Sequence, residues 1–268
     1  MKNNQPSITV SILPHKYLVE RIVGDHFKVN VLTPPGANHE TYEPTTRQIK
    51  ELSDADLLVI NGFLLFEDNL AKKFGRSPSV KLVDLSHGVN LISSEVVQQG
   101  NHVHLHGVDP HFWLSPAEVK VMARNMLHVL TALTPDNAEL FESNYQGFMN
   151  DIDTLDAFIR QSFSDLRTRT FLIYHPALSY FARDYDLNQV AIEMEGKEPT
   201  VQHMKKIADL AMQEHIKTVF IQSQFSIATA RAVAHEIGGK VVTLNPVPEN
   251  WLESMYEMTR ILHQAMIE

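Results

Sequence analysis

Three segments that lie far apart in the chain contain the residue types of a metal site. The segment NHVHLHGVDPHFWLSP includes His111, the turn PPGANHETYEP includes the pair His39 and Glu40, and FLIYHPALSYF includes His175. Imidazole is a common metal ligand, and its charge changes near neutral pH. The chain has no cysteine, so a metal in this protein would be held by nitrogen and oxygen atoms.

The elements around these segments predict that they come together. His175 ends the apolar run Thr170–His175, and His39 follows the run Lys28–Thr33 through a proline-rich turn. His111 lies just before the start of a helix. Because ligands in open α/β sheets bind outside the carboxyl ends of the strands, we expect one shared metal site.

Short, strongly apolar runs alternate with helical patterns along the chain. Runs of this kind are typical of strands buried on both faces, and their alternation with helices predicts mainly parallel sheets. The expected strands are Ser7–Leu13, Lys28–Thr33, Ala55–Asn61, Val80–Ser86, Thr170–His175, Asn188–Glu193, Thr218–Ser223 and Lys240–Asn245.

Two long helices are predicted between the first four strands, which end at Ser86, and the last four, which begin at Thr170. The first begins at Ser115, with Pro116 at the first helical position and Glu118 completing a capping box. The second begins at Thr134 and Pro135, and its apolar spacing continues for about 28 residues, or roughly 42 Å.

The length of this second helix exceeds the diameter of a lobe that contains half of the chain. We therefore expect the helix to run along both lobes. The expected organisation is an N-terminal α/β lobe over residues 1–134, a linking spine helix over 135–164 and a C-terminal α/β lobe over 165–268. A rigid spine of this kind predicts small lobe movements and a cleft between the lobes.

The composition excludes several classes of protein. The formal charge of −9 and the lack of a basic stripe argue against a nucleic-acid partner. No apolar run reaches the roughly 18 residues of a membrane-spanning helix. The first residues, MKNNQPS, have no apolar core of a signal peptide, so the protein is either cytoplasmic or a mature form whose export signal has been removed.

The irregular loop expected over Ser93–Val108 contains three alternating histidines, His102, His104 and His106. In an extended segment they would share one face. Two interpretations stay equally open: a weak, mobile loop that captures metal, and a solvated polar loop.

Several of these segments together resemble a known family, the zinc/manganese-type solute-binding proteins of ABC metal-uptake transporters. The resemblance spans nearly the whole chain and rests on GANHETYEPT, ELSDADLLVINGF, DPHFWLSP, YHPALSYFARDYDL and FIQSQFSIATARAVAHEIGGKVVTLNPV. DPHFWLSP is the most specific of them. The resemblance implies two α/β lobes joined by one long helix, a metal in the cleft between them, and His111 and His175 among its ligands.

Two neighbouring residues compete for the place of the first ligand. Family members commonly have proline-histidine, one further residue and then a tyrosine, and counting back from Tyr42 places the ligand at Glu40. Imidazole chemistry favours His39 instead. Neighbouring side chains diverge, so we expect one of the two to reach the metal and keep both as candidates.

The other departures from the family pattern favour zinc, with manganese as the alternative. Asn245 stands where many manganese-type members have an aspartate ligand, and Gln222 stands where many members have a glutamate. Both changes remove oxygen charge, which suits tetrahedral Zn²⁺ better than a hard cation. Glu193 and Glu195 are candidates for a further oxygen ligand, although a solvated strand end is the favoured interpretation.

We therefore expect a non-enzymatic zinc receptor, a monomer that delivers its ion to an ABC transporter permease. The resemblance implies that it works in the periplasm or anchored on the outside of the cytoplasmic membrane. The alternatives are a manganese or iron receptor of the same family, a zinc-dependent hydrolase and an adhesin. Against the hydrolase, HExxH fails because position 43 is glutamate, so the second histidine of that motif is missing.

Overall fold

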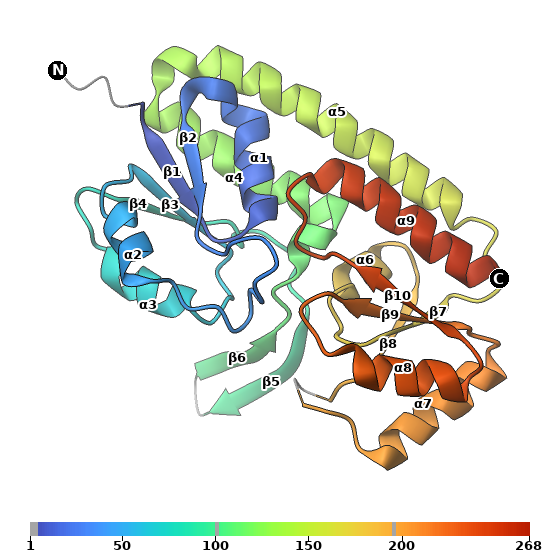
Figure 1. Cartoon of the computed structure of the whole chain (residues 1–268). Helices are drawn as coiled ribbons and strands as arrows, with labels where there is room; N and C mark the ends of the chain where they lie inside the picture. Colours follow the sequence, from blue (N-terminus) through green and yellow to red (C-terminus); the bar gives the residue numbers. More distant parts are fainter. Residues whose placement is uncertain (1–4, 100–101, 195–196) are drawn as a thin grey trace. The chain divides into compact units, whose positions relative to one another are not determined.

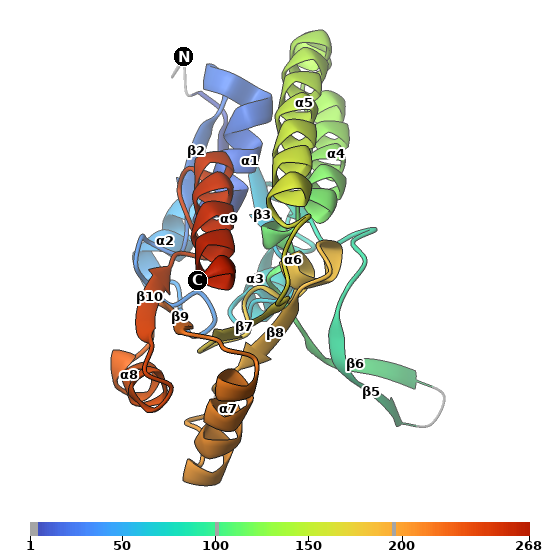
Figure 2. The ribbon, with the colours of Figure 1, turned by 90° about the vertical axis from the view of Figure 1, so that its right-hand side faces the viewer.

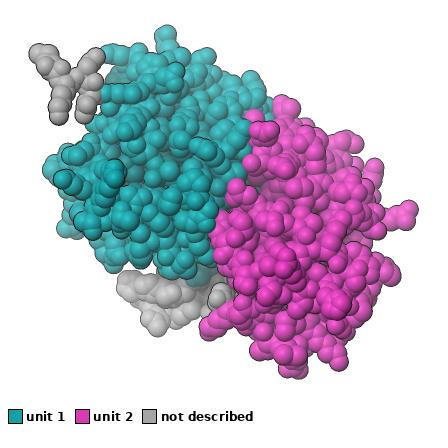
Figure 3. All heavy atoms as spheres, viewed as in Figure 1, with its two compact units in different colours: residues 1–153, 247–251 teal, residues 154–246, 252–268 magenta. Residues whose placement is uncertain are grey.

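The chain forms two compact units, which Figure 3 colours teal and magenta. The structure, a computed structural model, describes residues 5–99, 102–194 and 197–268, and over 94–99 and 102–106 it describes the backbone alone. Unit 1 consists of Met1–Asp153 with Val247–Trp251, and unit 2 of Thr154–Pro246 with Leu252–Glu268. The three-part boundaries expected from the sequence stay a prediction.

Unit 1 is built on a four-stranded parallel sheet in the order β2-β1-β3-β4 (Figure 1). The central strand β3 is buried along its whole length, whereas the edge strand β2 is only partly buried. The strands are β1 (Ser7–Val10), β2 (Lys28–Val31), β3 (Leu57–Ile60) and β4 (Lys81–Asp84).

The helices of unit 1 begin at sequence signals that fix their first turns. Thr45 and Gln48 form a capping box at α2. At α4 the Ser115 hydroxyl accepts a hydrogen bond from the Glu118 backbone N–H, as predicted for the N-cap, whereas the Glu118 carboxylate accepts from the Asn90 backbone N–H at 3.1 Å. The elements are α1 (Leu13–Val23), η1 (Gly24–His26), α2 (Thr46–Leu52), α3 (Glu67–Phe74), η2 (Phe112–Leu114) and α4 (Pro116–Leu133).

The segment before His111 is not the irregular loop that the sequence suggested. The strands β5 (Ser93–Gln99) and β6 (His102–Val108) pair antiparallel as a two-stranded sheet, visible as a projecting ribbon in Figure 2. The prediction of an irregular loop was wrong because β5 and β6 satisfy each other's backbone hydrogen bonds. The side chains of His102, His104 and His106 lie outside what the structure describes, so the capture-loop interpretation stays open.

The predicted long helix is present as α5 (Ala138–Ser162), 25 residues that follow the short turn η3 (Pro135–Asn137). Phe141, Phe148, Ile152 and Leu155 form its buried stripe, at spacings of three, four and seven. The helix contributes residues to both units, since the division falls after Asp153.

Unit 2 repeats the architecture with a second four-stranded parallel sheet, in the order β10-β9-β7-β8. Its central strands β7 and β9 are buried along their whole length, whereas the edge strands β8 and β10 are partly exposed. The elements are β7 (Thr170–Ile173), α6 (Ser179–Asp184), β8 (Asn188–Ala191), α7 (Val201–Gln213), β9 (Thr218–Gln222), α8 (Ile227–Glu236), β10 (Lys240–Leu244) and α9 (Trp251–Ile267).

The two parallel sheets confirm the α/β fold class and all eight predicted strands. The expectation that every strand is buried on both faces was wrong for the edge strands, because each has a neighbour on one side only. Among the described residues, no helix is both long enough and apolar enough to cross a membrane.

Candidate metal centre

His39 lies in the turn after β2, where Gly36 takes the left-handed backbone conformation that the turn requires (φ +80°). Its side chain is buried, with 4% of its surface exposed. The ring stands edge-on to the rings of His111 and Trp113, with centroids 5.2 and 5.4 Å away. The turn therefore directs an imidazole into the interior of unit 1.

His111 is held by the carboxylate of Asp109, two residues earlier. Asp109 Oδ1 accepts hydrogen bonds from both the His111 backbone N–H, at 2.9 Å, and the ring Nδ1, at 2.7 Å. Because the carboxylate accepts a hydrogen bond from Nδ1–H, the proton of the neutral ring stays on Nδ1 and the lone pair is on Nε2. The arrangement selects the tautomer that a metal ion at Nε2 needs.

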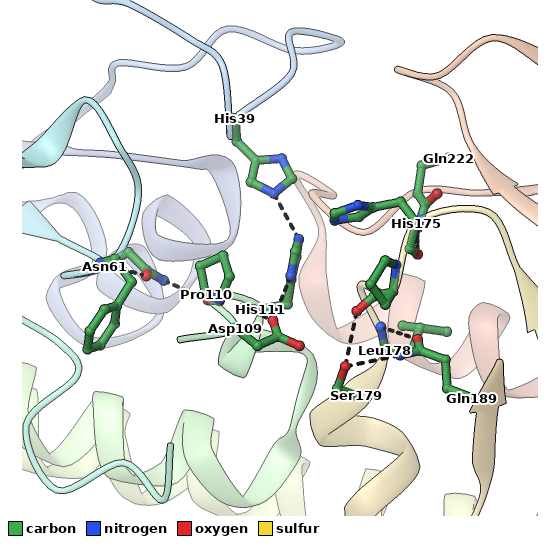
Figure 4. Close-up of polar contacts among 12 residues, drawn as sticks. His39, Asn61, Asp109, Pro110, His111, His175, Leu178, Ser179, Gln189 and Gln222 are labelled. Carbon is green, nitrogen blue, oxygen red and sulfur yellow. Dashed lines mark hydrogen bonds and ion pairs between the residues drawn. The ribbon is translucent and has the colours of Figure 1, made fainter. Parts of the chain in front are cut away.

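The two imidazoles meet at their Nε2 atoms, which lie 3.1 Å apart (Figure 4). Two ligands of one tetrahedral zinc ion, each at 2.0–2.1 Å, are separated by about 3.3 Å. Glu40 completes a group in which the ligand atoms of His39, Glu40 and His111 all lie within 4.8 Å of one another. Unit 1 thus brings together three of the four candidate ligands.

The fourth candidate, His175, lies in unit 2 just beyond the carboxyl end of β7, and it is also buried. Its Nδ1 lies 2.8 Å from Glu193 Oε1, and its ring stacks on Phe225 with the centroids 5.0 Å apart. Gln222 Nε2 donates to the His175 carbonyl oxygen at 2.7 Å, a contact on the backbone of the ligand candidate.

Sequence reasoning missed the carboxylates that orient the two histidines. The favoured interpretation of Glu193 as part of a solvated strand end was wrong, since only 8% of its surface is exposed and its carboxylate contacts His175. Glu195 lies outside the described residues. The contact between His175 and Glu193 depends on the strand order, which cannot be read from the sequence. Strands β7 and β8 are neighbours and Ile173 pairs with Ala191, so His175 and Glu193, each two positions later, lie side by side.

Trp113 forms a wall behind the ligand candidates of unit 1. Its indole is fully buried and stands 5.1 Å from the His111 ring, centroid to centroid. A third imidazole, His15, approaches the same indole edge-on at 6.2 Å. The Trp113 carbonyl oxygen accepts a hydrogen bond of 2.7 Å from Trp251 Nε1, which comes from the late segment of unit 1.

Residues 8–265 of the chain match the sequence model of one protein family, which is described as "ZnuA: Zinc-uptake complex component A periplasmic". The chain belongs to this family. The match confirms the resemblance seen in the sequence, and it covers both sheets and all four candidate ligands.

Curated relatives of this zinc-uptake family have similar sequences over most of the chain. The high-affinity zinc uptake system protein ZnuA of Bacillus subtilis (strain 168) is 28% identical over 253 residues, which cover 91% of this chain and 79% of that protein. The zinc-binding lipoprotein AdcA of Streptococcus pneumoniae (strain ATCC BAA-255 / R6) is 27% identical over 97% of this chain. The matched region spans 55% of AdcA, so this chain corresponds to about half of that protein.

Solved structures of the zinc-uptake family have the same fold. A crystal structure of ZnuA is 35% identical, with a TM-score of 0.90 and coverage of 98% of this chain and 100% of that one. A zinc-bound ZnuA deletion mutant is also 35% identical, with a TM-score of 0.89 and 98% coverage of both chains. The laminin-binding protein of Streptococcus agalactiae, described as an adhesin with metal-transporting activity, is 25% identical with a TM-score of 0.85, covering 97% of this chain and 99% of that one.

Proposed function

We propose that this chain is the zinc-capturing receptor of an ABC transporter and delivers its ion to the membrane permease without catalysing a reaction. The observation that carries the proposal is the pair of Nε2 atoms 3.1 Å apart, each on a buried imidazole. The relatives named for zinc uptake and zinc binding support zinc as the cargo. The descriptions of the relatives and structures named above refer to zinc or to metal transport, and none of them refers to manganese or to hydrolysis.

His39, His111 and His175 are the ligands in this proposal. His39 is preferred to Glu40 because its Nε2 lies beside that of His111 and its side chain is buried, whereas Glu40 is only half-buried. His175 is included on chemical grounds: like His111, it has a carboxylate at Nδ1, which leaves the lone pair of a neutral ring on Nε2.

The nitrogen ligands suit zinc better than a hard cation. Zinc accepts three imidazoles in a tetrahedral site, with a fourth position for water or a carboxylate, and Glu40 lies near enough to supply that carboxylate. Because the ligands bind in the deprotonated state, zinc affinity should fall as the pH drops through the histidine range.

The ligand set is tested by titrating zinc against a competing fluorescent chelator, with the wild type and alanine variants compared side by side. The wild type should bind one zinc ion per chain. His39→Ala, His111→Ala and His175→Ala should each weaken binding more than about 100-fold, beyond the loss typical of outer-shell changes. Glu40→Ala should weaken it less than His39→Ala.

The exposed His128 on α4 gives a matched control, and His128→Ala should bind zinc like the wild type. Wild-type affinity in both His111→Ala and His175→Ala would reject the site. A larger loss for Glu40→Ala than for His39→Ala would assign the first ligand to Glu40. Turnover of an ester, amide or phosphoester by the zinc-loaded protein would contradict the receptor function.

We further propose that the receptor acts as a monomer outside the cytoplasmic membrane, in the periplasm or held at the membrane surface. The family description "periplasmic" and the lipoprotein among the relatives support this location. Light scattering of the zinc-loaded protein should give the mass of a single chain, 30.4 kDa. A concentration-independent dimer would contradict the monomer.

A further inference from the structure

The peptide unit that connects Pro110 to His111 is held at both of its polar atoms (Figure 4). Its carbonyl oxygen accepts a hydrogen bond from Asn61 Nδ2 at 3.2 Å, and its N–H donates to Asp109 Oδ1 at 2.9 Å. The orientation of this peptide sets the direction in which the His111 side chain leaves the backbone. Asn61 therefore contacts the one backbone unit that aims the ligand candidate.

Asn61 is itself fixed in place. It follows the carboxyl end of β3 and is fully buried, with 0% of its surface exposed. Its backbone N–H donates to Glu67 Oε1 at 2.7 Å, and its Oδ1 accepts from the Phe63 backbone N–H at 3.3 Å. With Oδ1 engaged inside its own loop, the amide can direct only its NH₂ group toward Pro110.

Glu67, the first residue of α3, holds the loop that contains Asn61. Its buried carboxylate accepts from the backbone N–H groups of Asn61 and Gly62, both at 2.7 Å, and of Leu64, at 3.1 Å. The Ser11 hydroxyl donates to the same carboxylate. A carboxylate offers about four acceptor sites, and these four donors use that capacity.

We propose that Asn61, held by Glu67, is a positioning residue that aims His111 at the zinc ion. The inference rests on the proposed function, because it concerns a ligand of that site. A purely local role in starting α3 would explain the bonds from Glu67 to Gly62 and Leu64. A local role does not explain why the Asn61 side chain donates a hydrogen bond outside its own loop, to the Pro110 carbonyl oxygen beside His111.

Asn61→Asp separates the two roles of this side chain. Aspartate keeps an oxygen for the Phe63 N–H and loses the Nδ2 donor to Pro110. We expect zinc affinity to fall by about 10- to 100-fold, the range found for residues that orient a ligand. The visible absorption of the Co²⁺-loaded protein should also change, because its intensity and band positions follow the geometry of the ligands. A role confined to stability would leave that spectrum unchanged.

Two control variants isolate the contact. Asn125→Asp removes a comparable amide-to-carbonyl bond, from Asn125 Nδ2 to the His87 oxygen at 2.7 Å, and Leu65→Ala alters an exposed side chain of the same loop. Both should keep wild-type zinc affinity and the wild-type Co²⁺ spectrum.

Wild-type affinity and an unchanged spectrum in Asn61→Asp would overturn the inference. If the wild type does not bind zinc, or if His111→Ala binds it equally well, the proposed function fails instead, so the two failures are distinguishable. Should Asn61→Asp fail to fold, Asn61→Ala, which also lacks the donor, decides by the same two measurements.

Discussion

A single carboxylate oxygen of Asp109 fixes both the backbone and the ring of His111, since Oδ1 accepts from the backbone N–H and from Nδ1. Glu193 acts on the His175 ring from a neighbouring strand. An ionised acceptor on Nδ1 makes the imidazole more basic at Nε2 and prevents the ring from rotating. Each histidine thus depends on a negative charge that does not itself have to touch the metal.

Replacing that charge by an amide should weaken zinc binding without unfolding the protein. We expect Glu193→Gln to lower zinc affinity by about tenfold, because a neutral amide oxygen is a weaker acceptor for the Nδ1 proton. Competition titration measures the change. Glu198→Gln is the control, since that carboxylate accepts from hydroxyl groups of Tyr174 and Thr229 rather than from a histidine. Equal losses in the two variants would show that Glu193 has no special role.

The sequence predicted the residues with ligand chemistry better than their partners. His111 and His175 stand at recognisable strand and helix boundaries, and the agreement of several such segments with the family motifs made them ligand candidates. Asp109 acts through the local turn that returns its carboxylate to His111, and the role of Glu193 depends on β7 and β8 being neighbours. The choice between His39 and Glu40 depends on the path of one turn, which periodicity does not specify.

At the scale of single elements, α5 contains one residue that works against the helix. Gly147 lies in its interior on an exposed face, and a Cβ added there would meet no described atom within 4 Å. Glycine costs a helix interior about 0.5–1 kcal/mol relative to alanine, because it loses more backbone freedom on folding.

Gly147→Ala should therefore raise the free energy of unfolding by about 0.5–1 kcal/mol, measured by urea denaturation of the zinc-free protein. Gly239→Ala is the contrasting variant, because its Cβ would lie 2.2 Å from the Lys217 carbonyl oxygen and should destabilise unit 2. A loss of stability in Gly147→Ala would contradict the expectation that the added Cβ lies in open space and only restricts the unfolded chain.

The elements themselves were largely predictable, for a physical reason. Strands buried between helices must be apolar over four or five residues, and runs such as that of β9 (Thr218–Gln222) have few alternatives. The β5–β6 pair was missed, although His102, His104 and His106 alternate with Val103 and Leu105 as in a strand, because the many polar residues of the segment favoured a loop.

For the whole molecule, two buried groups of unit 1 couple stability to pH in opposite directions. Complete burial lowers the pKa of His15 to about 3, and neither of its ring nitrogens has a hydrogen-bond partner among the described residues. Burial raises the pKa of Glu67 to about 7, against four hydrogen bonds that act to lower it.

The folded chain keeps His15 neutral, while the unfolded chain binds a proton there below about pH 6.5, so His15 removes stability as the pH falls from 6.5 toward 3. Glu67 does the reverse. The folded chain keeps its proton up to about pH 7 and the unfolded chain loses it above about pH 4.5, so Glu67 removes stability as the pH rises through that window. Between pH 4.5 and 6.5 the two effects oppose each other.

His15→Phe should expose this balance while keeping a ring edge-on to Trp113. Relative to the variant, the wild type should lose about 1.4 kcal/mol of unfolding free energy per pH unit as the pH falls below 6.5. Urea denaturation in the presence of a chelator, from pH 7 to pH 4.5, gives the difference. His128→Phe, which replaces an exposed histidine, should show no such slope. Parallel curves for the wild type and His15→Phe would rule out a neutral, buried His15.

The late segment Val247–Trp251 also determines when the protein can finish folding. The ribosome makes it after nearly all of unit 2, yet Trp251 is buried in unit 1, where its indole bonds to the carbonyl of Trp113 beside His111. A nascent chain that has emerged only as far as residue 246 contains every ligand candidate. It lacks Trp251, whose indole bonds to Trp113 behind His39 and His111. We therefore expect the packing around Trp113, behind His39 and His111, to be completed only after most of unit 2 has been synthesised.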